Sequence, residues 1–390
     1  MSNFIKRVIA IYKDMGGLLF VLFALSLYYI VERKIDGYFL VAFSIYCYIK
    51  IPIKVYWDKS GLVLLLFMIS YSALIQMNNL QTGTVFAITN FISPLAFYIY
   101  GKYIVENRKT TNNILAFLFL TGAISIINLM YLVVKDMQDI GIVNVNRMLG
   151  DDLEEVSATM YGLIASIAVG AIGAIFAKKW LSWLQLVLFV MLGLAGLLIN
   201  IHFVNRTFIL GLAFSFAVIL LLNGKNHRTT FFFFFLVGTA YLVLDSGILY
   251  NSEVTDAYLF RSNYSADAAS GGGRLERWGF ALSSMFNYPL GFSDGNEKYY
   301  AHNLWLDIAR QTGIIPFVLI SLFSISGYKA LYLTCKIRMD QITVMILSIS
   351  AVVFVYCMAE PVIEGLPLYF YLFCMLMGMQ IQTYKQTCQR

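Results

Sequence analysis

The stretch YYAHNLWLDIARQTGIIPF, residues 299–317, brings together side chains that could carry out proton transfer and anion binding. His302 is one of only three histidines in the chain. It precedes a short patterned helix, whose positive dipole end would hold the imidazole neutral. A neutral imidazole accepts a proton near pH 7. We therefore expect His302 to act as a general base.

The helix that follows His302 is expected to carry its polar groups on one face. Asn303, Asp307 and Arg310 share that face, opposite an apolar one. Asp307 and Arg310 are one turn apart, so we expect them to pair. Gly313 is expected to end this helix before Pro316 opens the next. Asn303 and Asp307 are interpreted as supporting residues for the base.

The segment SGGGRLERWGFALSSMFNYPLGF, residues 270–292, is predicted to form a second amphipathic helix. Leu275, Trp278, Leu282 and Met285 recur in it at helical spacing, which is typical of a helix lying on or dipping into a membrane surface. Three glycines precede this helix, and the Asn-Tyr-Pro sequence at 287–289 is expected to end it.

Two arginines stand in the first turn of that helix, where a cation opposes the helix dipole. This placement indicates that Arg274 binds an anion, with Arg277 as a second candidate, although Glu276 could serve as the partner of one of them. Trp278, which follows Arg274 by one turn, is interpreted as a supporting residue.

Two further arginines could extend the cation group. Arg206 lies where one apolar run turns back into the next, which fits a guanidinium at a helix end that either reaches toward water or binds an anion. Arg147 precedes an acidic run within residues 151–155. Adjacent carboxylates in a loop are more often solvated than metal-bound, so we expect no metal site there.

Several arginines and a histidine beside apolar helices suit an amphiphile with a diphosphate and a hydrocarbon tail. Guanidinium groups bind phosphate oxygens in pairs and stabilise a leaving diphosphate without a metal, while histidine takes the proton from an attacking hydroxyl. A glycine-rich ATP-binding loop is not found in the sequence, and we expect no cofactor.

The composition places the whole chain in a membrane. Of its 390 residues 59% are hydrophobic and 13% are charged, where a soluble domain averages about one quarter charged residues. The N-terminal segment MSNFIKRVIAIYKDMGG is basic and has no small-residue cleavage site after it, which predicts a retained signal anchor. The net charge of +6 is an orientation signal and gives no indication of nucleic-acid binding.

Apolar runs predict an all-α integral membrane protein with about twelve spans in a single polytopic domain over residues 1–390. The basic clusters fall mostly on one side, so both termini are expected in the cytoplasm. Residues 135–157 and 246–302 are expected to form a smaller and a main periplasmic loop, the latter with short amphipathic helices. The predicted spans are 16–31, 37–53, 60–77, 85–105, 113–134, 158–177, 184–203, 206–222, 230–245, 314–332, 341–359 and 367–383.

The motifs GGGRLERWGFALSSMFNYPLG and HNLWLDIARQTGIIPF, with NRT upstream, resemble those of the O-antigen ligase and O-antigen polymerase superfamily. The family pattern is an arginine at the start of a mid-chain span, then Arg-x3-aromatic in a large periplasmic loop, then His-Asn with a glycine further on. Here these are Arg206, Arg274 with Trp278, His302 with Asn303, and Gly313. The turn Gly-Ile-Ile-Pro at 313–316 departs from the Gly-x-x-Gly of many members, which we expect to affect helix entry only.

The resemblance implies a metal-independent glycosyltransferase of the bacterial inner membrane that takes a glycan from undecaprenyl diphosphate on the periplasmic face. Arg206 and Arg274 would bind the diphosphate and His302 would activate the acceptor hydroxyl. The sequence around His302 and the short main loop favour a polymerase of lipopolysaccharide O-antigen repeat units. Its acceptor would be another lipid-linked repeat unit, and a chain-length regulator would be a partner. A ligase that transfers the finished chain to lipid A core shares these residues.

A flippase or exporter of a lipid-linked oligosaccharide is the alternative from another class. Such a transporter places charges near the middle of the membrane and has two related halves. In this sequence the spans are nearly free of charge and the polar groups gather at one surface. That asymmetry favours an enzyme acting at the membrane surface.

Overall fold

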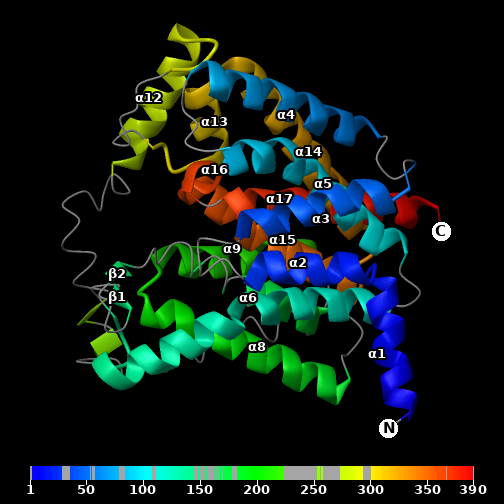
Figure 1. Ribbon diagram of the computed structural model, residues 1–390. Coiled ribbons are helices and arrows are strands. Elements are labelled where there is room, and N and C mark those ends of the chain that lie inside the picture. Colours follow the sequence, from blue (N-terminus) through cyan, green and yellow to red (C-terminus); the bar gives the residue numbers. More distant parts are fainter. Residues whose placement is uncertain are drawn as a thin grey trace. The chain divides into compact units, whose positions relative to one another are not determined.

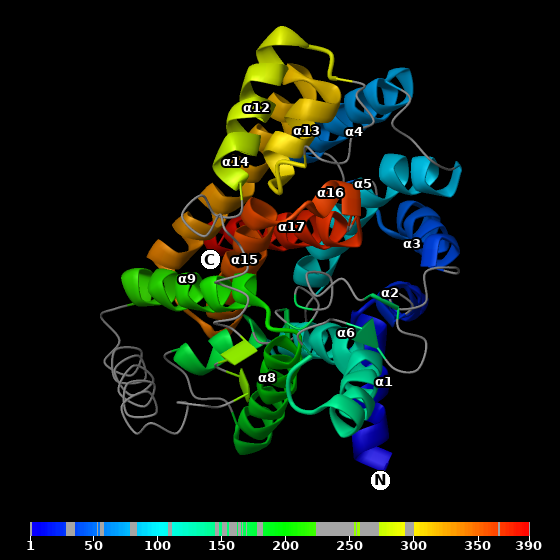
Figure 2. The same ribbon diagram turned by 90° about the vertical axis from the view of Figure 1, so that its left-hand side faces the viewer.

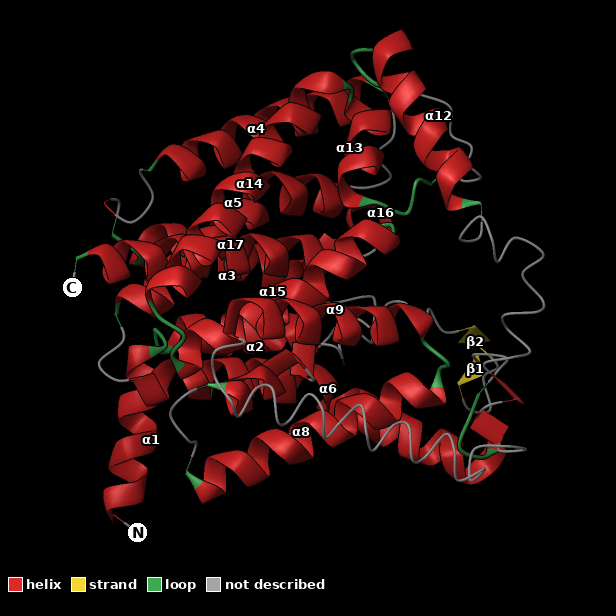
Figure 3. Cartoon of the chain, turned by 180° about the vertical axis from the view of Figure 1, so that it is seen from behind, coloured by secondary structure: helices red, strands yellow, loops and turns green. Residues whose placement is uncertain are grey.

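The structure is a computed structural model, and nearly all of its described secondary structure is helical (Figures 1 and 3). The chain divides into two compact units, each of which is described by itself. Unit 1 holds Met1–Phe117, Arg274–Ile337 and Cys357–Arg390, and unit 2 holds Leu118–Gly273 and Arg338–Tyr356. The structure describes residues 2–28, 36–52, 54, 58–78, 84–107, 111–144, 148–149, 154–155, 162, 165, 167–168, 170–177, 182–223, 253–254, 256–257, 273–292, 300–365 and 367–389.

Six described helices are long and apolar enough to cross a membrane, which makes the chain an α-helical membrane protein. The predicted span 230–245 and much of 158–177 lie outside the described residues, so the number of twelve spans stays a prediction. The six are α4 (Lys59–Met77), α6 (Thr111–Ile140, apolar from Asn113), α8 (Trp183–His202), α9 (Arg206–Asn223), α14 (Ile314–Ile337) and α15 (Gln341–Ala359).

The N-terminal segment is itself helical, which the sequence analysis does not predict. Helix α1 (Ser2–Asp14) carries the basic residues and ends at a break, after which α2 (Leu18–Tyr28) leaves at an angle of 83°. Gly16 and Gly17 have φ of 95° and 59° at this break, a conformation that glycine adopts without steric cost. Helix α3 (Asp36–Lys50) then packs against α2.

The interior of unit 1 is formed by α5 (Thr84–Glu106) and α17 (Pro367–Cys388), which pack along each other. Their backbones approach closely because glycines lie at the contact. A Cβ atom at Gly101 would overlap the carbonyl oxygen of Met375, and one at Gly378 would overlap that of Tyr98. Small residues allow this kind of close packing between membrane helices.

Hydrogen bonds attach both ends of α4 to its neighbours in unit 1. At its start, Asp58 caps the helix and accepts from Lys102 Nζ at 2.6 Å and Lys385 Nζ at 2.9 Å. At its end, Asn78 Nδ2 donates to the carbonyl oxygen of Gln311 at 2.9 Å. Gln311 belongs to the short helix after His302. This hydrogen bond therefore fixes the end of α4 against the segment that contains the candidate site residues.

That segment consists of α12 (Arg274–Asn287), α13 (Leu304–Thr312) and α14, which lie side by side in Figure 2. The predicted start and end of α12 and the end of α13 at Gly313 are confirmed. Some apolar side chains of α12 are buried and others are exposed: Met285 is buried, while Leu275 and Leu282 are exposed. The short α16 (Val362–Gly365) packs against α13 and α17.

Gly313 is required by the junction between α13 and α14. Its φ is 77°, and a Cβ atom there would overlap the carbonyl oxygen of Pro289. We therefore expect Gly313→Ala to lower the free energy of unfolding by more than about 1 kcal/mol. Gly279→Ala is the matched control, since Gly279 lies inside α12 and an added Cβ atom there would meet nothing within 4 Å, so it should not destabilise. Thermal unfolding in detergent measures both, and equal melting temperatures would contradict this interpretation.

Unit 2 contains most of α6 and α15, together with α8, α9, the 3-10 helix η3 (Ala171–Phe176) and two short strands. Strands β1 (Met148–Leu149) and β2 (Glu154–Glu155) pair antiparallel, so the expected plain loop around the acidic run contains a small ribbon. Helices α9 and α15 are joined by a hydrogen bond of 2.9 Å between Ser215 and Ser348.

Candidate active site

His302 is held in an unusual backbone conformation just before α13. Its φ is 51°, a region that residues other than glycine rarely enter and that costs free energy unless the surroundings impose it. The carboxylate of Asp307 imposes it by accepting from the backbone N–H of Ala301 at 2.6 Å and of Asn303 at 3.1 Å. One side chain thus fixes the residues on both sides of His302.

The two other supporting residues predicted from the sequence also act on this segment. Asn303 is the N-cap of α13, and its Oδ1 accepts from the N–H groups of Trp305 and Leu306. Trp278 on α12 donates its indole N–H to the carbonyl oxygen of Ala301 at 2.8 Å. These contacts attach α12 to α13 next to the imidazole, so Asn303, Asp307 and Trp278 are positioning residues for His302.

The expected interaction between Asp307 and Arg310 is only part of the environment of this carboxylate. Burial raises the pKa of Asp307, while the backbone hydrogen bonds and the positive charge of Arg310 lower it. The guanidinium of Arg310 also lies over the ring of Tyr300, 5.8 Å from its centroid. Asp307 therefore both faces Arg310 and holds the backbone on either side of His302.

Arg274 and His302 converge on a carboxylate that the sequence analysis does not identify. Arg274 Nη2 lies 3.8 Å from Glu360 Oε1, and His302 Nδ1 lies 4.0 Å from Glu360 Oε2. Glu276, the partner suggested by the sequence, is exposed on α12. The carboxylate that faces Arg274 is therefore Glu360, from the connection between α15 and α16.

The imidazole of His302 is kept neutral, but the cause differs from the one expected. Burial, followed by the positive charges of Arg274 and Arg277, lowers the pKa of His302 to about 4. A buried site disfavours imidazolium, and two nearby cations repel it. Its Nδ1 atom is buried and has no hydrogen-bond partner among the described residues, so this ring nitrogen can still accept or donate a proton.

The positive charge of Arg277 has a measurable consequence for pH dependence. Removing it in Arg277→Ala removes one repulsion of the imidazolium, so the pKa of His302 rises from about 4 toward the ordinary histidine value. The acidic limb of the rate profile should then move to higher pH. Arg277→Lys keeps the charge and should leave the limb where it is. A histidine NMR titration gives the same comparison without turnover, and identical titrations of the two variants would contradict the assigned cause.

Arg206 occupies the expected place at a helix start in unit 2. It is the first residue of α9, its side chain is exposed, and only Phe203–Asn205 separates α9 from α8. Asn205 Oδ1 accepts from the N–H of Phe208, which caps the first turn of α9. Arg147 lies outside the described residues. In unit 1 the structure thus brings Arg274, Arg277 and His302 together. Arg206 belongs to unit 2 and is described there by itself.

A second histidine forms a buried pair that the sequence analysis does not predict. His202 Nε2 lies 2.8 Å from Asp136 Oδ2, and its Nδ1 lies 3.0 Å from the carbonyl oxygen of Ile142. Asn144 donates to the same Asp136 oxygen at 2.8 Å. His202 is fully buried, so it orders the turn before Arg206 and is not accessible to a substrate.

Glu360 is the residue of this site that a sequence signal could have identified. It is an acidic residue followed by proline, in a short connection between two predicted spans, on the side predicted for His302. Its side chain is only 8% exposed. A buried carboxylate beside a cation is a frequent feature of functional sites.

Comparisons with known proteins do not assign a family or a function to this chain. The chain matches no protein-family model, and a search of curated proteins finds no match. The chemistry of the residues and the resemblance of their motifs therefore carry the functional argument.

Proposed function

We propose that this chain is an inner-membrane polymerase of surface polysaccharide, which transfers a growing glycan from undecaprenyl diphosphate to another lipid-linked repeat unit. The observation that carries the proposal is the neutral, half-buried imidazole of His302 beside the guanidinium groups of Arg274 and Arg277. A base next to two cations suits a reaction in which a hydroxyl loses a proton and a diphosphate leaves.

The proposed reaction is a single displacement at the anomeric carbon of the donor sugar. The acceptor hydroxyl oxygen forms the new glycosidic bond while the bond from that carbon to the diphosphate oxygen breaks. The hydroxyl proton passes to His302, and the electron pair of the broken bond leaves with undecaprenyl diphosphate. Arg274 and Arg277 neutralise the developing negative charge, since guanidinium groups bind phosphate oxygens in pairs.

Glu360 has two roles in this proposal. Before substrate binds, it balances the charge of Arg274, at a distance of 3.8 Å that is too long for a direct hydrogen bond. A diphosphate can therefore take over the guanidinium without breaking a short ion pair. After proton transfer, the carboxylate at 4.0 Å from His302 Nδ1 stabilises the imidazolium that forms.

The proposed topology has about twelve spans, both termini in the cytoplasm and this site on the periplasmic side. Arg206 and Arg147 are further candidates for binding the diphosphate, Arg206 because the resemblance implies it. The partners are the undecaprenyl-diphosphate-linked donor, the lipid-linked acceptor, membrane lipids and a chain-length regulator.

A deletion strain complemented with the wild-type gene or with Glu360→Gln tests this proposal. Polysaccharide separated on a gel should show a full ladder for the wild type, and only core with one repeat unit for the deletion. Glu360→Gln should give a shortened ladder at equal protein level. Loss of all attached glycan, with long polymer remaining on the carrier lipid, would identify a ligase instead. An unchanged ladder in the deletion strain would exclude both.

A further inference from the structure

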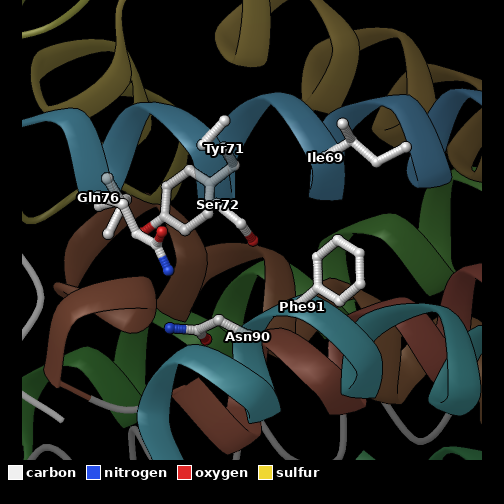
Figure 4. Close-up of a pocket in the computed structure, with 8 residues that line it drawn as sticks. Ile69, Tyr71, Ser72, Gln76, Asn90 and Phe91 are labelled. Carbon is white, nitrogen blue, oxygen red and sulfur yellow. The ribbon is translucent and has the colours of Figure 1, made fainter. Parts of the chain in front are cut away.

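A cavity of about 340 Å³ lies between α4 and α5 in unit 1, apart from the residues around His302. Figure 4 shows side chains of α4 extending toward α5, with Asn90 and Phe91 of α5 opposite them. Its volume is near the lower end of the range for small-molecule sites, about 300–1,000 Å³. Its lining includes Tyr71, Ser72, Gln76, Asn90 and Phe91.

Three polar side chains line this cavity, and one of them, Ser72, has a hydroxyl group left without a partner among the described residues. The Oγ atom of Ser72 is buried. Asn90 is 7% exposed, and its Oδ1 accepts from Tyr371 Oη at 2.8 Å. Gln76 is exposed and also lines the cavity.

The unpartnered hydroxyl group of Ser72 contrasts with the hydroxyl groups of serines in other helices of the chain. Ser44, Ser125 and Ser324 each donate to the carbonyl oxygen one turn earlier, which is how helical serines usually satisfy their hydroxyl group. Ser72 does not, and a polar group without a partner in an apolar environment is unfavourable. This difference indicates that a ligand completes its hydrogen bonding.

The lining is uncharged and combines polar side chains with the apolar Ile69, Ala73 and Ile75, which suits an uncharged ligand that has both hydroxyl groups and an apolar face. Amide and hydroxyl side chains can both donate to and accept from such groups, and none of the lining residues is charged. Phe91 and Tyr71 add aromatic surface, which packs against the C–H faces of a sugar ring. A phosphate or carboxylate would find no cation here, in contrast to the surroundings of His302.

Hydrogen bonds within unit 1 connect this cavity to the helix that follows His302. Tyr71 Oη donates to Gln311 Oε1 at 2.9 Å, and Asn78, at the end of the same helix, contacts the Gln311 carbonyl oxygen. Gln311 lies on α13, whose N-cap is next to His302. We propose that the cavity between α4 and α5 binds a sugar of the lipid-linked acceptor, leaving the cationic site to the diphosphate of the donor. This inference rests on the proposed function.

Equilibrium binding to the full-length protein in nanodiscs tests this subsite without requiring turnover. The probe is the repeat-unit oligosaccharide released from the host's own surface polysaccharide and coupled to an octyl chain. Wild type should bind it, and Asn90→Leu and Gln76→Leu should each weaken binding at least tenfold. Ser72→Ala should weaken it less, by loss of one hydrogen bond. Ser70→Ala is the matched control, because Ser70 donates to the Phe67 carbonyl oxygen and does not line the cavity.

The outcomes separate this inference from the proposed function. The probe carries no diphosphate and its binding is measured without turnover, so binding survives even if the chain proves not to be a transferase. The inference is overturned if Asn90→Leu and Gln76→Leu bind the probe like wild type. It is also overturned if octanol competes as well as the octyl oligosaccharide, since the groove would then hold a hydrocarbon chain.

Discussion

Replacing His302 by glycine is expected to abolish polymer formation while leaving the fold at least as stable as wild type. The φ of 51° at this position is strained for histidine and unstrained for glycine, so the substitution relieves strain in the backbone. The substitution also removes the neutral imidazole, which is the proton acceptor beside Arg274. The rate of transfer should fall by about 10²–10⁴-fold, the usual contribution of a general base.

Thermal unfolding and rate measurements on the same preparation separate the two effects. His302→Asn is the second variant, because asparagine tolerates a positive φ but cannot act as a base. Both variants should melt at or above the wild-type temperature and both should be inactive. An active His302→Gly enzyme would show that the imidazole has no chemical role, and a less stable one would show that the side chain holds the segment together.

Arg274→Lys is expected to lower the transfer rate about 10²–10³-fold, although it conserves charge. Lysine offers a point charge and cannot present the paired N–H groups of a guanidinium to two phosphate oxygens. It also cannot reproduce the geometry in which Arg274 faces Glu360 at 3.8 Å. Rates measured at saturating donor should show the loss in turnover as well as in donor affinity.

Glu276→Gln is the matched control for Arg274, since Glu276 lies in the same first turn of α12 and is exposed. It should leave the rate within about twofold, as expected for a solvated surface charge. A loss in Glu276→Gln as large as that in Arg274→Lys would mean that the first turn of α12 acts through its local structure. In that case the arginine would have no direct contact with the diphosphate.

Local patterns predicted the elements near the site well. The glycines before Arg274, the Asn-Tyr-Pro sequence after α12 and the glycine after α13 are signals that operate within a few residues, and the structure confirms the helix ends that they mark. The helical membrane class followed from the apolar runs. The break between α1 and α2 was not predicted, because the glycines there could equally belong to the beginning of a straight span.

Interactions between distant parts of the chain were harder to predict. Arg274 and His302 could be grouped because both lie in polar segments on one predicted side. Glu360 is separated from His302 by the whole of α14 and α15, and no spacing rule connects them. The positive φ of His302 was also beyond the sequence, since it results from the hydrogen bonds of Asp307 to the residues on both sides.

The most direct test of the proposed function uses purified protein in liposomes with lipid-linked repeat units as the only substrate and no nucleotide. The proposal predicts that wild-type protein lengthens the carrier-linked chains and releases one undecaprenyl diphosphate for each bond formed, and that His302→Gly does neither. If wild-type protein leaves the chains unextended, but transfers them to added lipid A core or only moves them across the bilayer, the polymerase proposal is contradicted.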